Sequence, residues 1–220
     1  MINVIIPAGG KSERYSKTTS KLDELIHGTS ILKRSIEAFI NHKHIQNIVI
    51  AYPKNEQKKY ESLALEAGPT VSITPGGETR AHSVYNAFKT LSDNNHILIH
   101  DAARPNPSQT LIQSIIDSLE HHPVVIPGLT ITDTIKKVSN NQITETINRE
   151  ALVAVQTPQG FHFNALHDAY ESITDFSMVT DEAKLLEMNG IYGTIVPGEK
   201  ENIKITHPID LTVLSSLIKA

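Results

Sequence analysis

The chain opens with the stretch Ile2-Asn3-Val4-Ile5-Ile6-Pro7-Ala8-Gly9-Gly10, which decides the fold that we expect. A short run dominated by Val and Ile is typical of a strand covered on both faces of a parallel sheet. Pro7 then stops the strand ladder, and the paired glycines let backbone N–H groups approach a ligand closely. The positive residues that follow are Lys11, Arg14, Lys17 and Lys21. The stretch therefore predicts a buried strand leading into a loop for an anion, such as a nucleotide triphosphate.

This loop is not a Walker A motif, although Gly10-Lys11-Ser12 matches the end of one. The first glycine of G-x-x-x-x-G-K-[ST] would fall on Ile5, inside the predicted strand, so the phosphate cradle of that motif could not form in this register. A G-x-G-x-x-G motif is also absent. Taken alone, the turn could equally be an ordinary connection between a strand and a helix.

Strands and helices alternate along most of the remaining chain. Val- and Ile-rich runs predict strands at 45–52, 71–73, 97–100, 124–126, 194–196 and 203–205. Apolar residues at helical spacing predict helices at 30–41, 55–66, 108–119, 164–172, 181–188 and 208–217, with another that ends near residue 91. Ser30 and Thr180 are the expected N-caps of two of these helices. The alternation predicts one α/β domain over residues 1–220, with a mostly parallel, three-layer sheet.

Residues 132–156 interrupt this alternation. Segments 133–138 and 143–147 each alternate apolar with polar residues, and the turn-forming residues 139–142 lie between them, which predicts a β-hairpin. A two-stranded hairpin is marginally stable alone, so it should pack against another surface. We expect a second subunit there, which makes the hairpin a dimerisation arm. The alternative is that it folds back on its own domain.

The composition limits the classes of function. A net charge of −4, with five Phe, six Tyr and no Trp, argues against a nucleic-acid surface. We expect no signal sequence before the first strand, and no apolar run approaches the roughly 20 residues that cross a membrane. Because the chain has no cysteine, it can form neither a disulfide nor a thiolate metal site, and we expect a cytoplasmic protein. The pairs His42/His44 and His121/His122 are expected at the solvent.

Four clusters should meet at one edge of the sheet, namely residues 9–21, 76–83 and 101–104 together with Lys204. Open α/β sheets bind ligands at the carboxyl ends of their parallel strands, and Asp101 directly follows an apolar run. Each cluster alone also has a structural explanation. Asp101 and Arg104 could form a local ion pair, and Lys204 could protect a strand at the sheet edge.

Seven segments follow one another along the chain: Pro7-Ala8-Gly9-Gly10, 76–87, His100-Asp101-Ala102-Ala103-Arg104-Pro105, Asp133-Thr134-Ile135-Lys136, Gln156-Thr157-Pro158-Gln159, Thr180-Asp181-Glu182-Ala183 and Asn202-Ile203-Lys204-Ile205-Thr206. Together, and in this order, they resemble the family of 2-C-methyl-D-erythritol 4-phosphate cytidylyltransferases of the non-mevalonate isoprenoid pathway. The resemblance extends from residue 2 to about residue 211, and the segment 100–105 is its most specific piece.

The resemblance implies a sheet of the nucleotide-diphospho-sugar transferase type and a homodimer with interlocking hairpin arms. It also implies Mg²⁺ as cofactor and CTP as the donor substrate. The phosphate of a sugar-alcohol acceptor would attack the α-phosphorus of CTP in line, giving a CDP-alcohol and pyrophosphate.

Matched position by position, the resemblance implies three groups of site residues. The catalytic cations are Arg14, Lys21 and Lys204, of which Arg14 and Lys21 would hold the triphosphate and Lys21 and Lys204 would flank the α-phosphoryl group. The nucleotide-binding positions are Ala8, Gly9, Gly10, Gly76, Gly77, Arg80, Ser83 and Ala102. The acceptor-binding positions are Asp101, Arg104, Arg149, Thr157 and Thr180. Arg149 would reach the acceptor phosphate of the neighbouring subunit, and Asp101 is the candidate metal ligand.

Two departures from the family pattern leave alternatives open. The family usually has glycine where Ser12 stands, and Pro-Lys-Gln where this chain has Ser20-Lys21-Leu22, so the loop should be less preset although Lys21 is kept. Ribitol 5-phosphate cytidylyltransferases resemble the same motifs, so ribitol phosphate is the alternative acceptor. A nucleotide-binding regulator without turnover is the third hypothesis.

Overall fold

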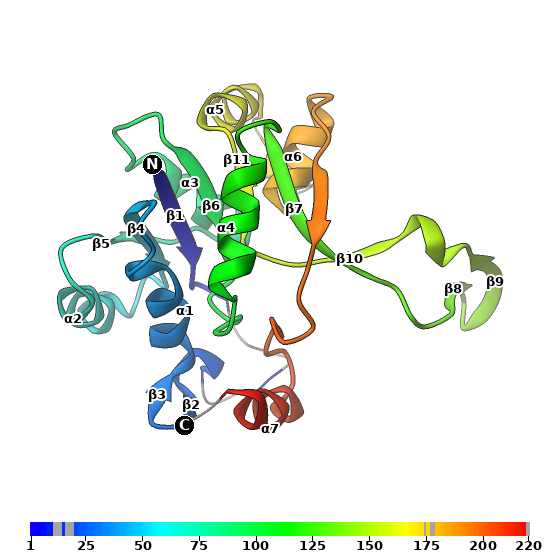
Figure 1. Ribbon diagram of the computed structural model, residues 1–220, viewed down its shortest axis with the longest axis horizontal. Helices are drawn as coiled ribbons and strands as arrows, with labels where there is room; N and C mark the ends of the chain where they lie inside the picture. The colour runs from blue at the N-terminus through cyan, green and yellow to red at the C-terminus, as the bar shows by residue number, and fades with distance from the viewer. Residues whose placement is uncertain (11–14, 16–19, 174, 177–178, 219–220) are drawn as a thin grey trace.

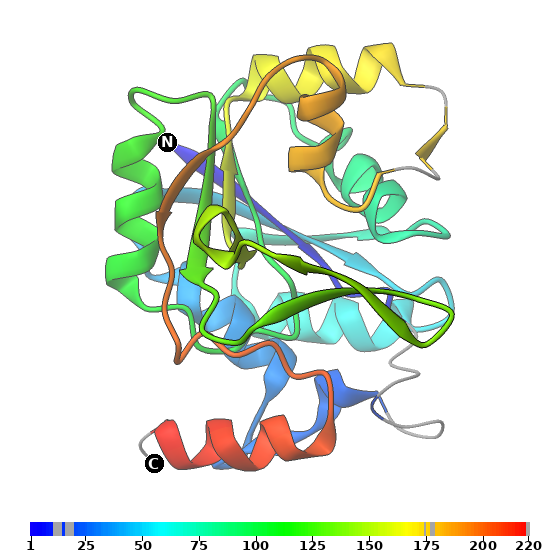
Figure 2. The same ribbon diagram turned by 90° about the vertical axis from the view of Figure 1, so that its right-hand side faces the viewer.

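The computed structural model of the protein describes residues 1–10, 15, 20–173, 175–176 and 179–218. Figure 1 shows helices packed on both faces of a central sheet, and a hairpin that extends from one side of this body. Figure 2, turned by 90°, shows the C-terminal helix below the sheet, beside residues 25–30.

The central sheet is mostly parallel, as predicted. Its strands run in the order β10-β7-β11-β6-β1-β4-β5, and β12 also pairs with β7. The strands that share one direction are β1 (Ile2–Pro7), β4 (Ile45–Tyr52), β5 (Val71–Pro75), β6 (His96–Ile99), β7 (Val124–Thr130) and β12 (Thr194–Pro197). The antiparallel strands are β10 (Val153–Val155) and β11 (Gln159–Phe161).

Strand β1 lies in the middle of this sheet and is buried on both faces. It pairs in parallel with β4 on one side and β6 on the other. Val4 and Ile6 pack into the core on one face, and Ile5 packs into the core on the other. The Val- and Ile-rich run is therefore explained by two packing layers at once.

The helices complete the three layers. Those that contribute to the core with Val4 and Ile6 are α1 (Ile31–Ile40), α2 (Gln57–Ala67), α4 (Gln109–Ser118) and α7 (Pro208–Leu217). Those that pack with Ile5 are α3 (Arg80–Phe88), α5 (Phe163–Ser172) and α6 (Glu182–Met188). Among the described helices, none is both long and apolar enough to cross a membrane.

Side-chain caps fix where several helices begin. Ser30 accepts a hydrogen bond from the backbone N–H of Lys33 at 3.3 Å, so the predicted cap of α1 is confirmed. The predicted cap of α6 is wrong, because Asp181 and not Thr180 accepts from the backbone N–H of Lys184, at 2.9 Å. Thr and Asp are both suitable N-caps, and Asp181 takes this position because the helix begins at Glu182.

The predicted strand at 203–205 is also wrong. This segment is irregular, and its backbone is held by a loop: Ile205 N–H donates to the Ala103 carbonyl at 2.9 Å.

Strand β11 was not predicted, because Gln159-Gly160-Phe161 is short and lacks β-branched residues. Gly160 is needed there, since a Cβ would come within 2.8 Å of Ile115 on α4. Two further elements are short, the β2–β3 ribbon (Leu25–Ile26 and Thr29–Ser30) and the 3₁₀ turn η1 (Lys21–Asp23).

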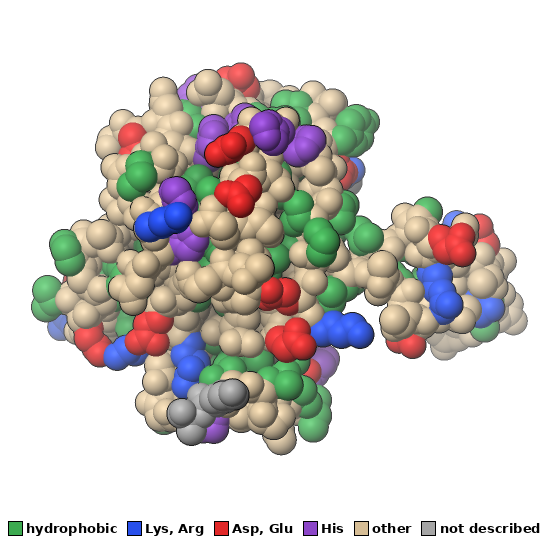
Figure 3. Space-filling model, in the orientation of Figure 1, with side chains coloured by type: hydrophobic (Ala, Val, Ile, Leu, Met, Phe, Trp, Pro, Cys, Tyr) green, Lys and Arg blue, Asp and Glu red, His purple; other side chains and the backbone are tan. Residues whose placement is uncertain are grey.

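The predicted hairpin is formed by β8 (Ile135–Ser139) and β9 (Gln142–Ile147). Asn140 and Asn141 connect the strands with positive φ angles of 48° and 60°, a conformation that asparagine tolerates well in two-residue hairpin turns. The arm projects from the body, with acidic and basic side chains on the face that Figure 3 shows. It does not fold back onto the sheet (Figure 1), and Val138 and Ile143 are 57% and 66% exposed.

A buried histidine anchors the carboxyl end of β6. His100 Nε2 lies 2.8 Å from the Arg104 carbonyl, which can only accept, so Nε2 carries the ring proton. Nδ1 then accepts from the Thr157 hydroxyl at 3.3 Å, and the same hydroxyl accepts from the Asp101 N–H at 2.9 Å. The ring also lies edge-on to Phe39 of α1, with 4.9 Å between centroids. Neutral His100 thus fixes the start of the loop that carries Asp101.

Folding stability should therefore fall as His100 becomes protonated. Burial lowers the pKa of His100 from 6.5 to about 4, so between these pH values the unfolded chain binds a proton at this residue that the folded chain does not. This group stabilises the fold above about pH 6.5, and its contribution falls by about 3 kcal/mol as the pH drops to about 4. Urea unfolding at several pH values should show a shallower pH dependence for His100→Gln than for the wild type. The surface variant His122→Gln should keep the wild-type slope, and an unchanged slope in His100→Gln would contradict the assignment.

Candidate active site

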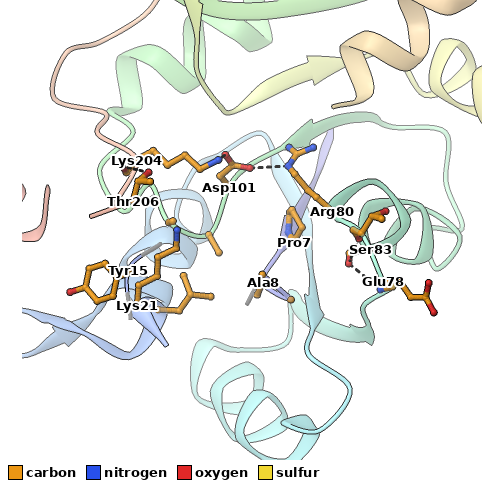
Figure 4. Close-up of a pocket in the computed structure, with 17 residues that line it drawn as sticks. Pro7, Ala8, Tyr15, Lys21, Glu78, Arg80, Ser83, Asp101, Lys204 and Thr206 are labelled. Carbon is orange, nitrogen blue, oxygen red and sulfur yellow. Dashed lines mark hydrogen bonds and ion pairs between the residues drawn. The ribbon is translucent and has the colours of Figure 1, made fainter. Parts of the chain in front are cut away.

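Loops that follow the carboxyl ends of β1, β5 and β6 line a cavity of about 810 Å³. The structure brings together ten of the residues singled out in the sequence: Ala8, Gly9, Gly10, Lys21, Gly77, Arg80, Ser83, Asp101, Ala102 and Lys204. The cavity is also lined by Pro7, Tyr15, Leu22, Glu78, Thr79, Ala103 and Thr206, which we did not predict. Figure 4 shows Lys21 and Lys204 on one side of this space and Ser83 on the other. The parallel sheet explains their convergence, because its strands end at one edge.

One wall of the cavity is a glycine turn held by Ser83. The Gly77 N–H donates to the Ser83 hydroxyl at 3.0 Å, and this hydroxyl donates to the Thr79 carbonyl at 2.8 Å. Neither glycine can be replaced without a shift. A Cβ on Gly77 would lie 2.4 Å from His82 Cγ, and one on Gly76 would lie 3.0 Å from the Tyr52 carbonyl oxygen. The turn therefore presents backbone to the cavity, with Gly76 behind it as support.

The facing wall carries Lys21 and Lys204. Lys21 begins η1, where Ser20 accepts a hydrogen bond from the Leu22 N–H at 3.3 Å and Leu22 is buried in the core. Lys21 Nζ donates to the carbonyl of Ile205 at 2.7 Å, directly after Lys204 in the chain. The residues that depart from the family pattern beside Lys21 thus have local structural roles, as a cap and as a core residue.

A chain of alternating charges crosses the cavity floor. Lys204 Nζ lies 2.7 Å from Asp101 Oδ2, and Arg80 Nε lies 3.0 Å from Asp101 Oδ1. Figure 4 shows Lys204 and Arg80 reaching Asp101 from opposite sides. Arg80 Nη1 lies 2.8 Å from Oε2 of Glu182, which is completely buried at the start of α6. Two cations and two anions are therefore linked in one row.

These contacts and burial shift the pKa values of Arg80, Asp101 and Glu182. Burial would raise the pKa of Asp101, but Arg80, Lys204 and Arg104 outweigh it and hold that pKa well below its ordinary value. Burial would lower the pKa of Arg80, but Glu182 and Asp101 raise it above its ordinary value. The pKa of Glu182 is raised by burial, against the opposing charge of Arg80. Asp101 is thus a permanent anion at the cavity, paired with two cations.

The cavity lining does not include five other predicted residues, namely Gly76, Arg104, Arg149, Thr157 and Thr180. Thr157 is buried behind Asp101, and its hydroxyl is engaged by Asp101 and His100. Arg104 donates to the Asn202 carbonyl at 2.8 Å and so holds the segment that leads to Lys204. Arg149 lies in the arm, in the 3₁₀ turn η2 (Arg149–Ala151), and donates to the Thr132 carbonyl. Thr180 is exposed before α6, and Arg14 lies outside the described residues.

Sequence reasoning also missed Glu182 as part of this row. It lies in the segment Thr180-Asp181-Glu182-Ala183, which carries part of the family resemblance but predicts no role for this glutamate. Its position held the only signal: Glu182 directly follows the Asp181 cap as the first residue of α6, and it falls on the same face of the helix as the buried Leu185 and Leu186.

The residues present fit a magnesium ion that arrives with a substrate. Among the described residues, no three His, Cys, Asp or Glu side chains form a group that could hold a metal. Mg²⁺ does not require such a group, because it keeps several waters and is usually held by one or two carboxylates and substrate phosphates. Asp101 is the matching carboxylate, since it lines the cavity and each of its oxygens has a lone pair beyond the bond that it accepts.

Comparisons with known proteins support one family. Residues 2–219 match the family model for 2-C-methyl-D-erythritol 4-phosphate cytidylyltransferase. Proteins of that name are similar to this chain in Bacillus cereus, with 36% identity over 99% of this chain and 98% of that protein, and in Clostridium beijerinckii, with 35% identity over 100% and 99%.

Solved structures of proteins named for this activity are also similar to this chain. The 2-C-methyl-D-erythritol 4-phosphate cytidylyltransferase of Francisella tularensis matches with a TM-score of 0.85 and 30% identity, covering 99% of both chains. The 4-diphosphocytidyl-2C-methyl-D-erythritol synthase of Anaerococcus prevotii matches with a TM-score of 0.83 and 25% identity, covering 98% of this chain and 97% of that one. The predicted α/β nucleotidyltransferase type of fold is confirmed, and the chain belongs to the 2-C-methyl-D-erythritol 4-phosphate cytidylyltransferase family.

Proposed function

We propose that this enzyme joins CTP and 2-C-methyl-D-erythritol 4-phosphate to give CDP-methylerythritol and pyrophosphate. An oxygen of the acceptor phosphate forms a bond to the α-phosphorus of CTP, and the bond from this phosphorus to the bridging oxygen of pyrophosphate breaks. One observation supports this most directly, in a chain of this family. Lys21 and Lys204 meet on one wall of a cavity whose other wall is a backbone-lined glycine turn. The named relatives favour methylerythritol phosphate over ribitol phosphate as acceptor.

The glycine turn suits a pyrimidine nucleotide. Ala8, Gly9 and Gly77 line the cavity without long side chains, so a cytosine ring can approach peptide groups directly. Ser83 keeps the turn in place through the Gly77 N–H. Gly10 and Ala102 line the adjoining space, where we assign the phosphates and the ribose.

Charge, not proton transfer, is the obstacle to this reaction. The acceptor phosphate already carries a charge of about −1.5 to −2 at neutral pH, so no general base is needed to make it a nucleophile. Two anions must meet while negative charge builds up around the α-phosphorus and on pyrophosphate. Lys21 and Lys204 flank that phosphorus in our assignment, and Arg14 completes the set. Asp101 would hold Mg²⁺ together with the triphosphate, and the bound ion would further neutralise the phosphate oxygens.

Asp101 has a second role in this scheme. Its carboxylate can accept hydrogen bonds from the acceptor hydroxyls, while Thr157 accepts from the Asp101 backbone N–H and is itself held by His100. Lys204 can turn from Asp101 to the phosphoryl group without leaving an unpaired carboxylate, because Arg80 remains bound to Oδ1. We also place the enzyme in the cytoplasm, which suits a chain without cysteine.

The reaction itself is tested by product analysis. The purified protein with CTP, Mg²⁺ and methylerythritol phosphate should form CDP-methylerythritol and an equal amount of pyrophosphate. Ribitol 5-phosphate should give a kcat/KM at least about tenfold lower, because pocket shape must discriminate the methyl branch. Comparable rates with ribitol phosphate would change the acceptor assignment. Absence of product with either acceptor would favour the regulator hypothesis.

Removal of either lysine should lower the rate of the chemical step. Lys204→Ala and Lys21→Ala should each reduce kcat by about 10²–10³-fold, the usual effect of losing one preorganised electrostatic partner. Lys200→Ala is the matched control, because Lys200 is exposed on the same segment as Lys204 and outside the cavity lining. Steady-state kinetics with both substrates saturating measures the effect. A kcat within threefold of the wild type would remove that lysine from the catalytic set.

The arm is assigned to a homodimer, with Arg149 serving the acceptor phosphate of the partner subunit. The arm supports this through its exposed Val138 and Ile143, which a second chain could cover. Arg149 supports it as well, because it lies in the arm and does not line the cavity of its own subunit. An Arg side chain suits this role, because its planar fork binds phosphate through two parallel hydrogen bonds.

The assignment of Arg149 can be tested by mixing variants. Arg149→Ala should still form dimers by light scattering but show a much lower kcat/KM for the acceptor, whereas Lys137→Ala on the same arm should behave as wild type. After subunit exchange, a mixture of Arg149→Ala and Lys204→Ala should recover about a quarter of wild-type activity, since half of the dimers then hold one intact site. If both residues serve the same subunit, the mixture will stay inactive.

A further inference from the structure

Glu182 is a buried carboxylate that the reaction scheme does not use. It is completely buried, and the residues around it on α5 and α6 form an apolar core that includes Tyr170, Leu185 and Leu186. Only Oε2 has a side-chain partner, Arg80, and the buried Oε1 has no hydrogen-bond partner among the described residues. The carboxylate is thus enclosed with one of its two oxygens unpaired among the described residues.

Folding stability alone does not explain why position 182 carries a buried carboxylate. Removing a carboxylate from water is costly, and a buried ion pair is often no more stabilising than apolar side chains of similar size. A Leu at position 182 would continue the apolar face of α6. The retained charge therefore points to an effect on its partner, Arg80.

Arg80 is the residue on which Glu182 acts. Its Nε binds Asp101 at 3.0 Å and its Nη1 binds Glu182 at 2.8 Å, so two carboxylates hold different nitrogen atoms of one planar group. Two such contacts fix the rotation of the guanidinium as well as its position. With Asp101 alone, the guanidinium could pivot about one hydrogen bond into the cavity that it lines.

We propose that Glu182 is a positioning residue, which holds Arg80 against Asp101 and so keeps both Asp101 and Lys204 in place for the acceptor. This rests on the function proposed above. In that reaction an incoming triphosphate competes for every cation at the cavity. Glu182 keeps Arg80 on Asp101, and Asp101 keeps its geometry when Lys204 turns to the phosphoryl group. The row also stays neutral before the substrates arrive, since Glu182 and Asp101 balance Arg80 and Lys204.

Glu182→Gln tests the proposal, because it removes the charge and keeps the shape. We expect kcat/KM for the acceptor to fall by about 10–100-fold, mainly through a higher acceptor KM, while the KM for CTP stays within about twofold. A loss of folded protein would instead lower the apparent kcat and leave both KM values unchanged. Glu187→Gln is the matched control, since it makes the same change on the exposed face of the same helix. It should behave as the wild type.

A double-mutant cycle shows whether Glu182 acts through Arg80. If it does, Arg80→Gln combined with Glu182→Gln should lose no more acceptor kcat/KM than Arg80→Gln alone, whereas independent effects would multiply. Multiplied losses, or an unchanged acceptor KM in folded Glu182→Gln, would overturn the proposal.

If Glu182→Gln does not fold, Glu182→Asp keeps the buried charge and withdraws it by one methylene group. A smaller rise of the acceptor KM is expected, and an unchanged KM in this folded variant would also overturn the proposal. The wild type serves as the reference for the reaction. If it forms no CDP-alcohol, the proposed function fails, independently of Glu182.

Discussion

The burial of β1 on both faces is the constraint on which the rest of the structure depends. Val4 and Ile6 pack into one layer and Ile5 into the other, so the strand can lie only in the middle of the sheet. Parallel pairing with β4 and β6 then places the loops after these strands at a common edge. Pro7 and the glycines that follow emerge at that edge, where the cavity lies.

The cavity must receive two anions without being destabilised by the cations that bind them. Its cations are paired before any substrate arrives: Lys204 and Arg80 share Asp101, and Lys21 donates to a backbone carbonyl. Paired cations exert less mutual repulsion, and a phosphate can replace a carboxylate as the partner of a lysine. The carboxylates of the row therefore matter to the reaction as well as the cations, because they pair the cations until a phosphate replaces them.

The segment that carries Lys204 shows how such a site is held without regular secondary structure. Residues 203–206 form neither helix nor strand, yet their backbone is fixed by side chains and loops from other parts of the chain. The Gln156 amide donates to the Glu199 carbonyl at 2.8 Å and accepts from the Glu199 N–H at 3.0 Å. Asn202 donates to the Thr157 carbonyl at 2.8 Å. A buried polar network of this kind fixes one conformation, because each broken bond would leave a buried polar group unpaired.

The α/β alternation, the hairpin, the Ser30 cap and the set of loops that meet at the cavity could be predicted from the sequence, because each depends on residues close together in the chain. Three features became visible only in the folded chain: Thr157 supports Asp101 from behind, residues 203–205 are irregular, and Asp181 caps α6. The pairing of Arg80 with Glu182, 102 residues apart, is of the same kind. It depends on where the fold places the first residues of α3 and α6, and periodicity does not record which polar side chains the fold brings within hydrogen-bonding distance.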